Sequence, residues 1–143
     1  MHQAKYMKRD LLYLSILIGM LVFVSCKKDP GSGGNSSING YTHLTIVNKS
    51  NLDDTLTTLA GTNEDVFIIY GDEISYGEKA NTGYDGKFEF KFLRKGKYKV
   101  YVYSESYNFL SGLIQDSALI KTVEITEKKQ TLDAGTFEIV KYR

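Results

Sequence analysis

Apolar and polar side chains alternate along residues 87–102, and this period of two constrains the fold more than any other feature of the chain. In a β-strand such alternation places the apolar residues on one face and the polar residues on the other. Two alternating runs are joined by a short loop that contains Gly96, which predicts a β-hairpin with one buried face. The predicted buried positions are Phe88, Phe90, Phe92, Tyr98, Val100 and Val102.

Further strands are predicted on either side of this segment. Residues 66–70 (VFIIY) are apolar at every position, which is typical of a central strand. Leu44 and Ile46 indicate an earlier strand, and Val123 and Ile125 indicate a later one.

The C-terminal segment changes phase. Leu132 and Ala134 share one parity, whereas Phe137 and Ile139 share the other. A β-bulge at Gly135 would turn the strand so that all four side chains reach the core. The alternatives are a solvent-facing Phe137 or two separate strands.

The strand pattern predicts the fold class. No stretch after residue 40 has a sustained helical period, although residues 109–120 are irregular and could hold a short turn of helix. Short strands with frequent turn signals are typical of a β-sandwich. We therefore predict an all-β domain over residues 40–143, built as a seven-stranded antiparallel sandwich that is long enough to bury a core without disulfides.

Three segments share their residues and spacing with a known family. They are Val66–Tyr70, Thr82–Phe90, and the positions Leu93, Gly96, Tyr98 and Val100. These segments resemble the carboxypeptidase-regulatory-like domains, and the similarity is strongest over residues 64–102. Those domains are transthyretin-like (prealbumin-like) Greek-key sandwiches, and most are accessory modules without chemistry of their own. The resemblance thus implies a fold, with Asp85-Gly86 as a tight turn, and a non-catalytic role.

The N-terminus is typical of an exported lipoprotein. Residues 1–25 combine the basic Lys5, Lys8 and Arg9 with an apolar stretch too short to span a bilayer, which predicts a signal peptide. Phe23-Val24-Ser25-Cys26 resembles a lipobox, whose Cys receives acyl chains before the signal is removed. We therefore expect Cys26 to be lipidated and to anchor the protein in a membrane. The alternative is an ordinary signal peptide that happens to end in Cys.

Residues 26–39 are expected to form a flexible tether between the lipidated Cys26 and the domain. The segment contains the only Pro of the chain and is rich in Gly and Ser, so it offers little apolar surface to bury. No Asp directly follows Cys26, and Lys27-Lys28-Asp29 is similar to surface-export signals of some diderm bacteria. We predict an outer-membrane lipoprotein that faces the periplasm or the cell surface.

Composition excludes several classes of function. A net charge of +1 argues against a nucleic-acid partner. The single Cys excludes an internal disulfide and multi-Cys zinc sites, and His43 is the only His after the predicted signal peptide. We expect no cofactor, no metal and no enzymatic activity. Calcium stays open as an alternative, because acidic pairs occur in predicted loops at Asp53-Asp54, Glu64-Asp65 and Asp72-Glu73.

The candidate binding surface is the outer face of the predicted hairpin with the tyrosines that follow. Six of the seven charged residues between positions 87 and 99 are basic. Lysines and exposed tyrosines on one face could contact an acidic protein surface or a glycan. We predict a protein-binding or scaffolding module of the cell envelope, with carbohydrate binding for nutrient uptake as the alternative. The face could also be merely solvated. Its residues are Lys87, Lys91, Lys97, Lys99, Tyr101, Tyr103 and Tyr107.

Overall fold

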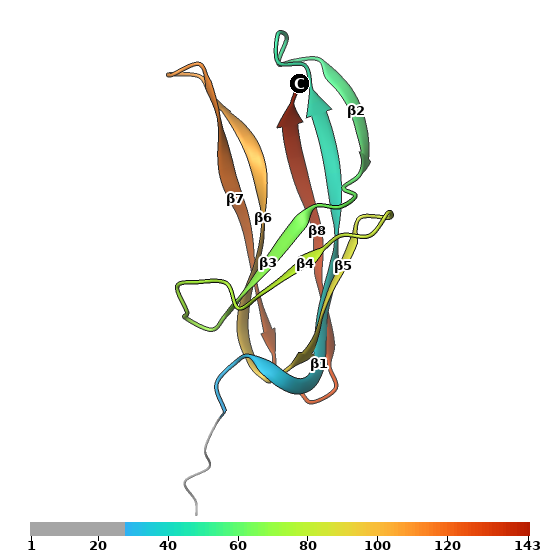
Figure 1. The fold of residues 1–143 in the computed structure, drawn as a ribbon, viewed down its shortest axis with the longest axis vertical. Helices are drawn as coiled ribbons and strands as arrows, with labels where there is room; N and C mark the ends of the chain where they lie inside the picture. Colours follow the sequence, from blue (N-terminus) through green and yellow to red (C-terminus); the bar gives the residue numbers. More distant parts are fainter. Residues whose placement is uncertain (1–27) are drawn as a thin grey trace, which may run out of the picture.

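The computed structural model describes residues 28–143, which form two β-sheets packed face to face (Figure 1). The strands are β1 (Ser32–Val47), β2 (Thr55–Ala60), β3 (Asp65–Tyr70), β4 (Glu78–Asn81), β5 (Lys87–Leu93), β6 (Gly96–Asn108), β7 (Leu113–Ile125) and β8 (Thr131–Tyr142). The prediction of an all-β fold is confirmed, with eight strands in these residues rather than seven, and with one parallel strand pair, β1 with β8, where only antiparallel pairs were predicted. No helix in residues 28–143 is long and apolar enough to cross a bilayer.

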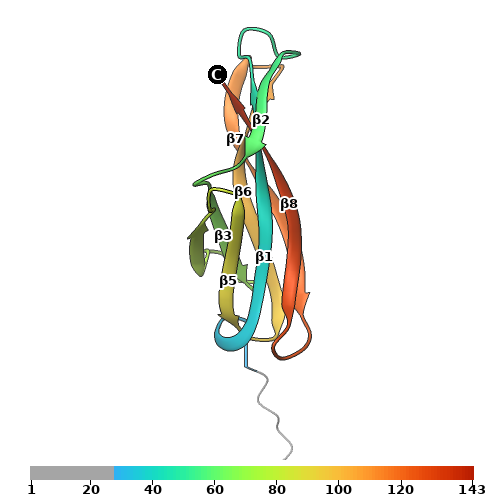
Figure 2. The same ribbon diagram turned by 90° about the vertical axis from the view of Figure 1, so that its right-hand side faces the viewer.

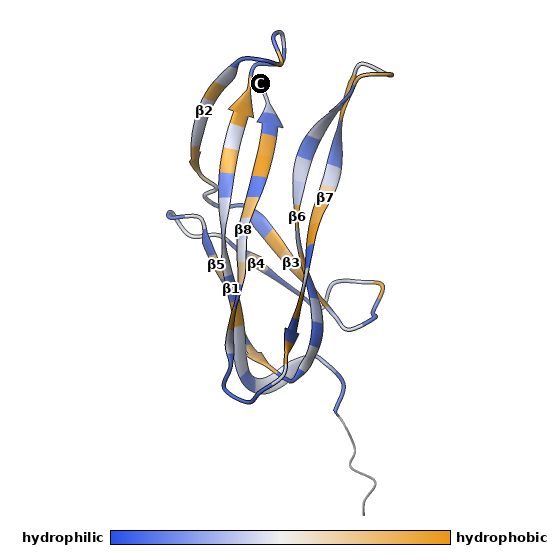
Figure 3. Cartoon of the chain, turned by 180° about the vertical axis from the view of Figure 1, so that it is seen from behind, coloured by the Kyte–Doolittle hydropathy of each residue, from blue (hydrophilic) through white to orange (hydrophobic). Residues whose placement is uncertain are grey.

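One sheet, called sheet A, is built around the long strand β1. Strand β8 pairs parallel with β1 along one side (Figure 2). Along the other side, β5 pairs antiparallel with the first part of β1 and β2 pairs antiparallel with its last part. The second sheet, sheet B, is antiparallel throughout and has the order β4-β3-β6-β7. Apolar and polar residues alternate along β1 and β8, as a strand with one buried face requires (Figure 3).

The core lies between the two sheets and is formed by their inward-facing side chains. Both sheets contribute aromatic and β-branched residues, which pack well on a pleated surface. Every strand lies between residues 32 and 142, so a chain that begins at residue 27 contains the whole domain described here. The core residues are Ile38, Val66, Ile68, Phe88, Phe90, Leu93, Tyr98, Val100, Val102, Ile125, Ala134, Phe137 and Ile139.

The predicted hairpin of residues 87–102 is wrong. Strand β5 belongs to sheet A and β6 to sheet B, so the chain crosses between the sheets at Arg94 and Lys95. The alternation correctly indicates a buried face on each strand, but these faces point toward each other across the core. Phe92 also departs from the expectation: it has a φ of 58° and is 69% exposed, and Leu93 is buried in its place.

The domain begins earlier than the predicted boundary at Gly40. Residues 32–39 are part of β1, and Ile38 is fully buried. This polar segment is ordered because it pairs with β5 on one side and with β8 on the other, so its backbone groups are satisfied without much apolar burial. The expected tether over residues 26–39 is therefore too long. Cys26 and the predicted signal peptide lie outside the described residues.

Two local predictions are confirmed. In β8, Gly135 has a φ of 72°, and the pairing with β1 shifts between Asp133 and Thr136, as a bulge requires. The Asp85-Gly86 turn leads into β5, with the Lys87 N–H donating to Asp85 Oδ1 and Gly86 at a φ of 77°. The irregular segment 109–120 forms the tip of the β6–β7 hairpin and the first part of β7, and the expected helical turn is limited to a single turn at the tip, where Gly112 N–H donates to Asn108 O at 2.8 Å.

Candidate functional site

The seven predicted surface residues do not share one face. Lys87 and Lys91 project from the outer face of sheet A, and Lys91 pairs with Glu89 at 3.2 Å. The other five lie on β6 in sheet B, because β5 and β6 belong to different sheets. The continuous basic face expected from the sequence is therefore not present.

Tyr107 is separated from Tyr101 and Tyr103. It lies near the end of β6, where its ring packs edge-on against Phe109 at 5.1 Å and lies 6.4 Å from the ring of Tyr142. Lys97 and Lys99 lie toward the opposite end of the same strand. Only Tyr101 and Tyr103, of the predicted tyrosines, come together.

Tyr101 and Tyr103 belong to a cluster of four rings on the outer face of sheet B, which we call the aromatic face. The register of β3 and β6 makes Phe67 and Tyr101 direct partners, and their rings stack with centroids 5.0 Å apart. Tyr103 packs edge-on against both, with centroids 5.8 Å from Phe67 and 5.7 Å from Tyr101. Tyr76, from the β3–β4 loop, packs against Phe67 at 5.1 Å. Tyr76 and Tyr103 are about half exposed, so the cluster offers rings to a ligand.

A polar network borders the aromatic face on strands β3 and β4. Lys79 Nζ lies 3.2 Å from both carboxylate oxygens of Asp65, and Asn81 Nδ2 donates to Asp65 Oδ1 at 2.7 Å. Lys79 is the cross-strand partner of Phe67, so the network and the rings are adjacent. All three polar side chains are exposed and retain hydrogen-bonding capacity for a ligand.

The aromatic face extends across the sheet toward β7. Ile120 is the cross-strand partner of Tyr101 and is exposed. The residues Lys79, Phe67, Tyr101 and Ile120 thus form one row over the four strands of sheet B.

The environment of Tyr101 keeps its phenol neutral. Burial raises the pKa of Tyr101, and the neighbouring phenols of Tyr103 and Tyr76 raise it further. The hydroxyl therefore keeps its proton well above neutral pH and can act as both hydrogen-bond donor and acceptor.

Sequence reasoning missed Phe67, Tyr76 and the polar network. The prediction of a central strand at residues 66–70 is confirmed, because β3 lies between β4 and β6, but only Val66 and Ile68 of the run are fully buried. The outward parity of Phe67 relative to these two residues was the available signal. Nothing local could reveal the pairing with Tyr101, which depends on the order of strands in sheet B.

Other candidate chemistry does not converge on a site. His43 Nδ1 lies 3.4 Å from Glu138 Oε1, and both side chains are more than half exposed. Glu64 and Asp65, predicted as one acidic pair in a loop, diverge at the start of β3, where Glu64 pairs with Lys141 and Asp65 with Lys79. Residues 28–143 contain no group of three or more His, Cys, Asp or Glu side chains that could hold a metal ion.

Comparisons with known proteins add little to this geometry. No family model matches the chain, and no curated protein matches it. Among solved structures, the chain is similar to the crystal structure of a Pseudomonas aeruginosa protein described as a "putative carbohydrate binding protein". The alignment has 14% sequence identity and a TM-score of 0.41, and it covers 79% of this chain and 91% of that chain. A similarity this low carries no argument about function.

Proposed function

We propose that the protein is a non-catalytic, lipid-anchored binding module that captures carbohydrate on the aromatic face of sheet B. The observation that carries this proposal is that two kinds of surface lie side by side on sheet B. Half-exposed tyrosine rings pack on Phe67, and the cross-strand partner of Phe67 is Lys79 of the Asp65–Lys79–Asn81 network. A sugar ring presents C–H groups on its faces and hydroxyls around its edge. Tyrosine rings pack against the former, while carboxylate, amide and ammonium groups hydrogen-bond the latter.

Protein scaffolding is the weaker candidate. It depended on a basic face shared by Lys87, Lys91, Lys97 and Lys99, and these lysines lie on two different sheets. Separate lysines on outer faces have a simpler role, because they keep strands soluble and discourage edge pairing.

The finer parts of the proposal rest on sequence motifs. We propose acylation of Cys26 from the Phe23-Val24-Ser25-Cys26 motif, and an outer-membrane location from the residues that follow. We also propose a transthyretin-like Greek-key sandwich. The geometry of the Asp85-Gly86 turn supports this assignment, since the turn of the family motif leads directly into β5.

Affinity electrophoresis of residues 27–143 tests the carbohydrate proposal. Native gels would contain xylan, starch, mannan, pectin or no polysaccharide. We expect at least one polysaccharide to retard the protein, and expect the Y76A/Y103A variant to migrate as if no polysaccharide were present. The matched control is Y84A, because Tyr84 is 89% exposed on the β4–β5 turn, outside the aromatic face.

Two outcomes would contradict the proposal. Migration unaffected by any polysaccharide is one, and equal loss of retardation in Y76A/Y103A and Y84A is the other. Thermal unfolding of each variant separates loss of binding from loss of fold.

A further inference from the structure

A cavity of about 980 Å³ opens at the end of the domain where the described chain begins. Three segments form it: residues 28–36, the β5–β6 connection, and the end of β7 with the loop after it. The β5–β6 and β7–β8 connections lie at this end of the long axis, whereas the C-terminus lies at the other (Figure 1). The cavity is thus far from the C-terminal end, and it lies outside the aromatic face.

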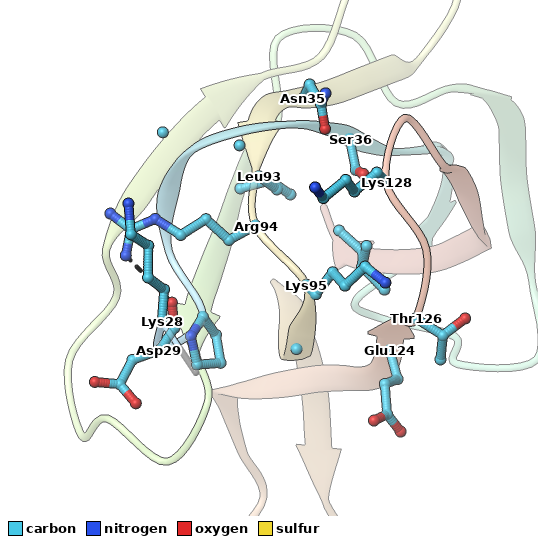
Figure 4. Close-up of a pocket in the computed structure, with 15 residues that line it drawn as sticks. Lys28, Asp29, Asn35, Ser36, Leu93, Arg94, Lys95, Glu124, Thr126 and Lys128 are labelled. Atoms are coloured by element: carbon cyan, nitrogen blue, oxygen red, sulfur yellow. Dashed lines mark hydrogen bonds between the residues drawn. The ribbon is translucent and has the colours of Figure 1, made fainter. Parts of the chain in front are cut away.

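The charged residues of the cavity lining are mostly cationic, four of six, so the lining carries a net positive charge. Lys28 and Arg94 lie on one side and Lys95 and Lys128 on the other, with Asp29 and Glu124 as the two acidic residues (Figure 4). Residues 28–143 as a whole hold 14 Lys or Arg and 16 Asp or Glu. The positive lining therefore contrasts with a domain that is negative overall. Apolar side chains of Pro30, Leu93 and Ile125 complete the lining.

The chain segment that leads into this cavity is fixed to the domain. The backbone N–H of Arg94 donates to Gly31 O at 2.9 Å, and Arg94 Nη1 donates to Asp29 O at 3.3 Å. The Gly31 N–H donates to the hydroxyl of buried Tyr98 at 3.0 Å. The Pro30 ring occupies space that only a glycine at position 96 leaves free. The entry point of the chain is therefore held beside the cavity.

The distance from this cavity to the proposed lipid anchor is short. Cys26 precedes Lys28 by two residues, and two residues of chain span at most about 7 Å. If Cys26 is acylated, as the proposed function holds, the cavity lies at the level of the lipid headgroups. Anionic headgroups attract Lys and Arg strongly only within about one Debye length of the surface, about 8 Å at physiological ionic strength.

We propose that this cavity binds the phosphate of anionic phospholipid headgroups and so sets the orientation of the domain on the membrane. The inference rests on the anchoring part of the proposed function and is independent of carbohydrate binding. Each basic residue held near an anionic bilayer raises the partition coefficient about fivefold. The cationic end of the domain therefore contacts the bilayer. The aromatic face of sheet B is then roughly parallel to the membrane normal and does not contact the lipid.

Vesicle flotation of residues 27–143, which lack acyl chains, tests the inference. The vesicles contain phosphatidylcholine alone or phosphatidylcholine mixed with phosphatidylglycerol. We expect binding only to the mixed vesicles, and expect the K28S/K95S/K128S variant to bind them roughly a hundredfold more weakly. The K49S/K87S/K91S variant is the matched control, because it loses the same charge at lysines outside the cavity.

Each result decides the matter. Equal binding to the two kinds of vesicle, or equal losses in the two triple variants, would overturn the inference. A soluble-anion site would also replace it, and this result is recognised if inorganic phosphate protects the protein against thermal unfolding while the mixed vesicles bind it no better than phosphatidylcholine alone. Labelling of the full chain with palmitate, and of its C26A variant, tests the anchor separately, so failure of anchoring is distinguishable from failure of headgroup binding.

Discussion

The rings of Phe67 and Tyr101 stack 5.0 Å apart because β3 and β6 hold these residues as direct cross-strand partners. Cross-strand aromatic pairs stabilise a sheet by about 0.5–1 kcal/mol. Tyr76 and Tyr103 pack edge-on against this pair, so their half-exposed rings are supported by neighbours. A face held in this way loses little conformational entropy when a ligand binds.

The first prediction concerns the polar border of the aromatic face. Changing Asp65→Asn removes the charge that Lys79 and Asn81 share, and we expect about tenfold weaker carbohydrate binding, since hydrogen bonds to charged groups contribute about 1.5–3 kcal/mol. Stability should change by less than about 1 kcal/mol, because the ion pair is exposed. Calorimetric titration with an oligosaccharide of the bound polysaccharide measures the affinity.

The chain offers a matched control for Asp65→Asn. Glu89 and Lys91 form an ion pair of the same length, 3.2 Å, on the outer face of sheet A. Glu89→Gln should leave carbohydrate affinity unchanged. Equal weakening by both substitutions would mean that overall charge, rather than the aromatic face, governs binding.

Local features of the fold were predictable from the sequence, and strand partners were not. The bulge at Gly135 and the turn at Asp85-Gly86 depend on neighbouring residues, so pattern and turn chemistry sufficed. The alternation of apolar and polar residues does not indicate whether β5 and β6 pair with each other as a hairpin or belong to different sheets. A hairpin and a crossing between sheets bury the same residues, and only the position of the neighbouring strands differs.

The second prediction uses the backbone of Phe92, at the point where β5 leaves its regular alternation. A φ of 58° costs an L-residue about 1–2 kcal/mol, and the side chain is exposed. We therefore expect Phe92→Gly to be more stable than Phe92→Ala by about 1 kcal/mol. In a regular strand the order is reversed, because glycine has more conformational entropy in the unfolded chain. Urea unfolding of the two variants measures the difference, and a more stable Phe92→Ala would contradict the left-handed backbone.

The candidate site was predictable only in part. Tyr101 and Tyr103 were found because consecutive outward positions of one strand lie on one face. Phe67 and Asp65 reach the same face through strand pairing in sheet B, and Tyr76 reaches it from the β3–β4 loop. Lys87 and Lys91 would share this face only if β5 and β6 formed a hairpin, and the two strands instead belong to different sheets.

The third prediction concerns stability at alkaline pH. Burial raises the pKa of Tyr98, although hydrogen bonds to the backbone of Gly31 and Arg94 partly oppose the shift. Because the pKa in the folded state is above the ordinary value of 10.0, the folded protein keeps a proton that the unfolded chain releases. The stabilisation is complete below pH 10 and is lost as the pH rises through the folded pKa.

Urea unfolding between about pH 9 and about pH 11 tests this behaviour. Stability should fall with pH less steeply in Tyr98→Phe than in the natural chain. At neutral pH the variant should also lose about 1–3 kcal/mol, since Gly31 N–H loses its acceptor. Tyr84→Phe, at an exposed tyrosine, is the control and should follow the natural chain. A pH dependence unchanged by Tyr98→Phe would contradict the raised pKa.

The last prediction concerns Lys121, which fixes the bulge of β8 from the opposite sheet. Its ammonium donates to Ala134 O at 3.1 Å and to Thr136 O at 2.7 Å, and it lies 4.7 Å from the centre of the Phe137 ring. Lys121→Met keeps the length of the side chain but removes both hydrogen bonds and the cation–π contact. We expect a loss of about 2–4 kcal/mol in urea unfolding. Lys79→Met, at an exposed lysine, should cost less than about 1 kcal/mol. If the two substitutions cost the same, the bulge is maintained by Gly135 alone, and the contacts of Lys121 contribute nothing to the fold.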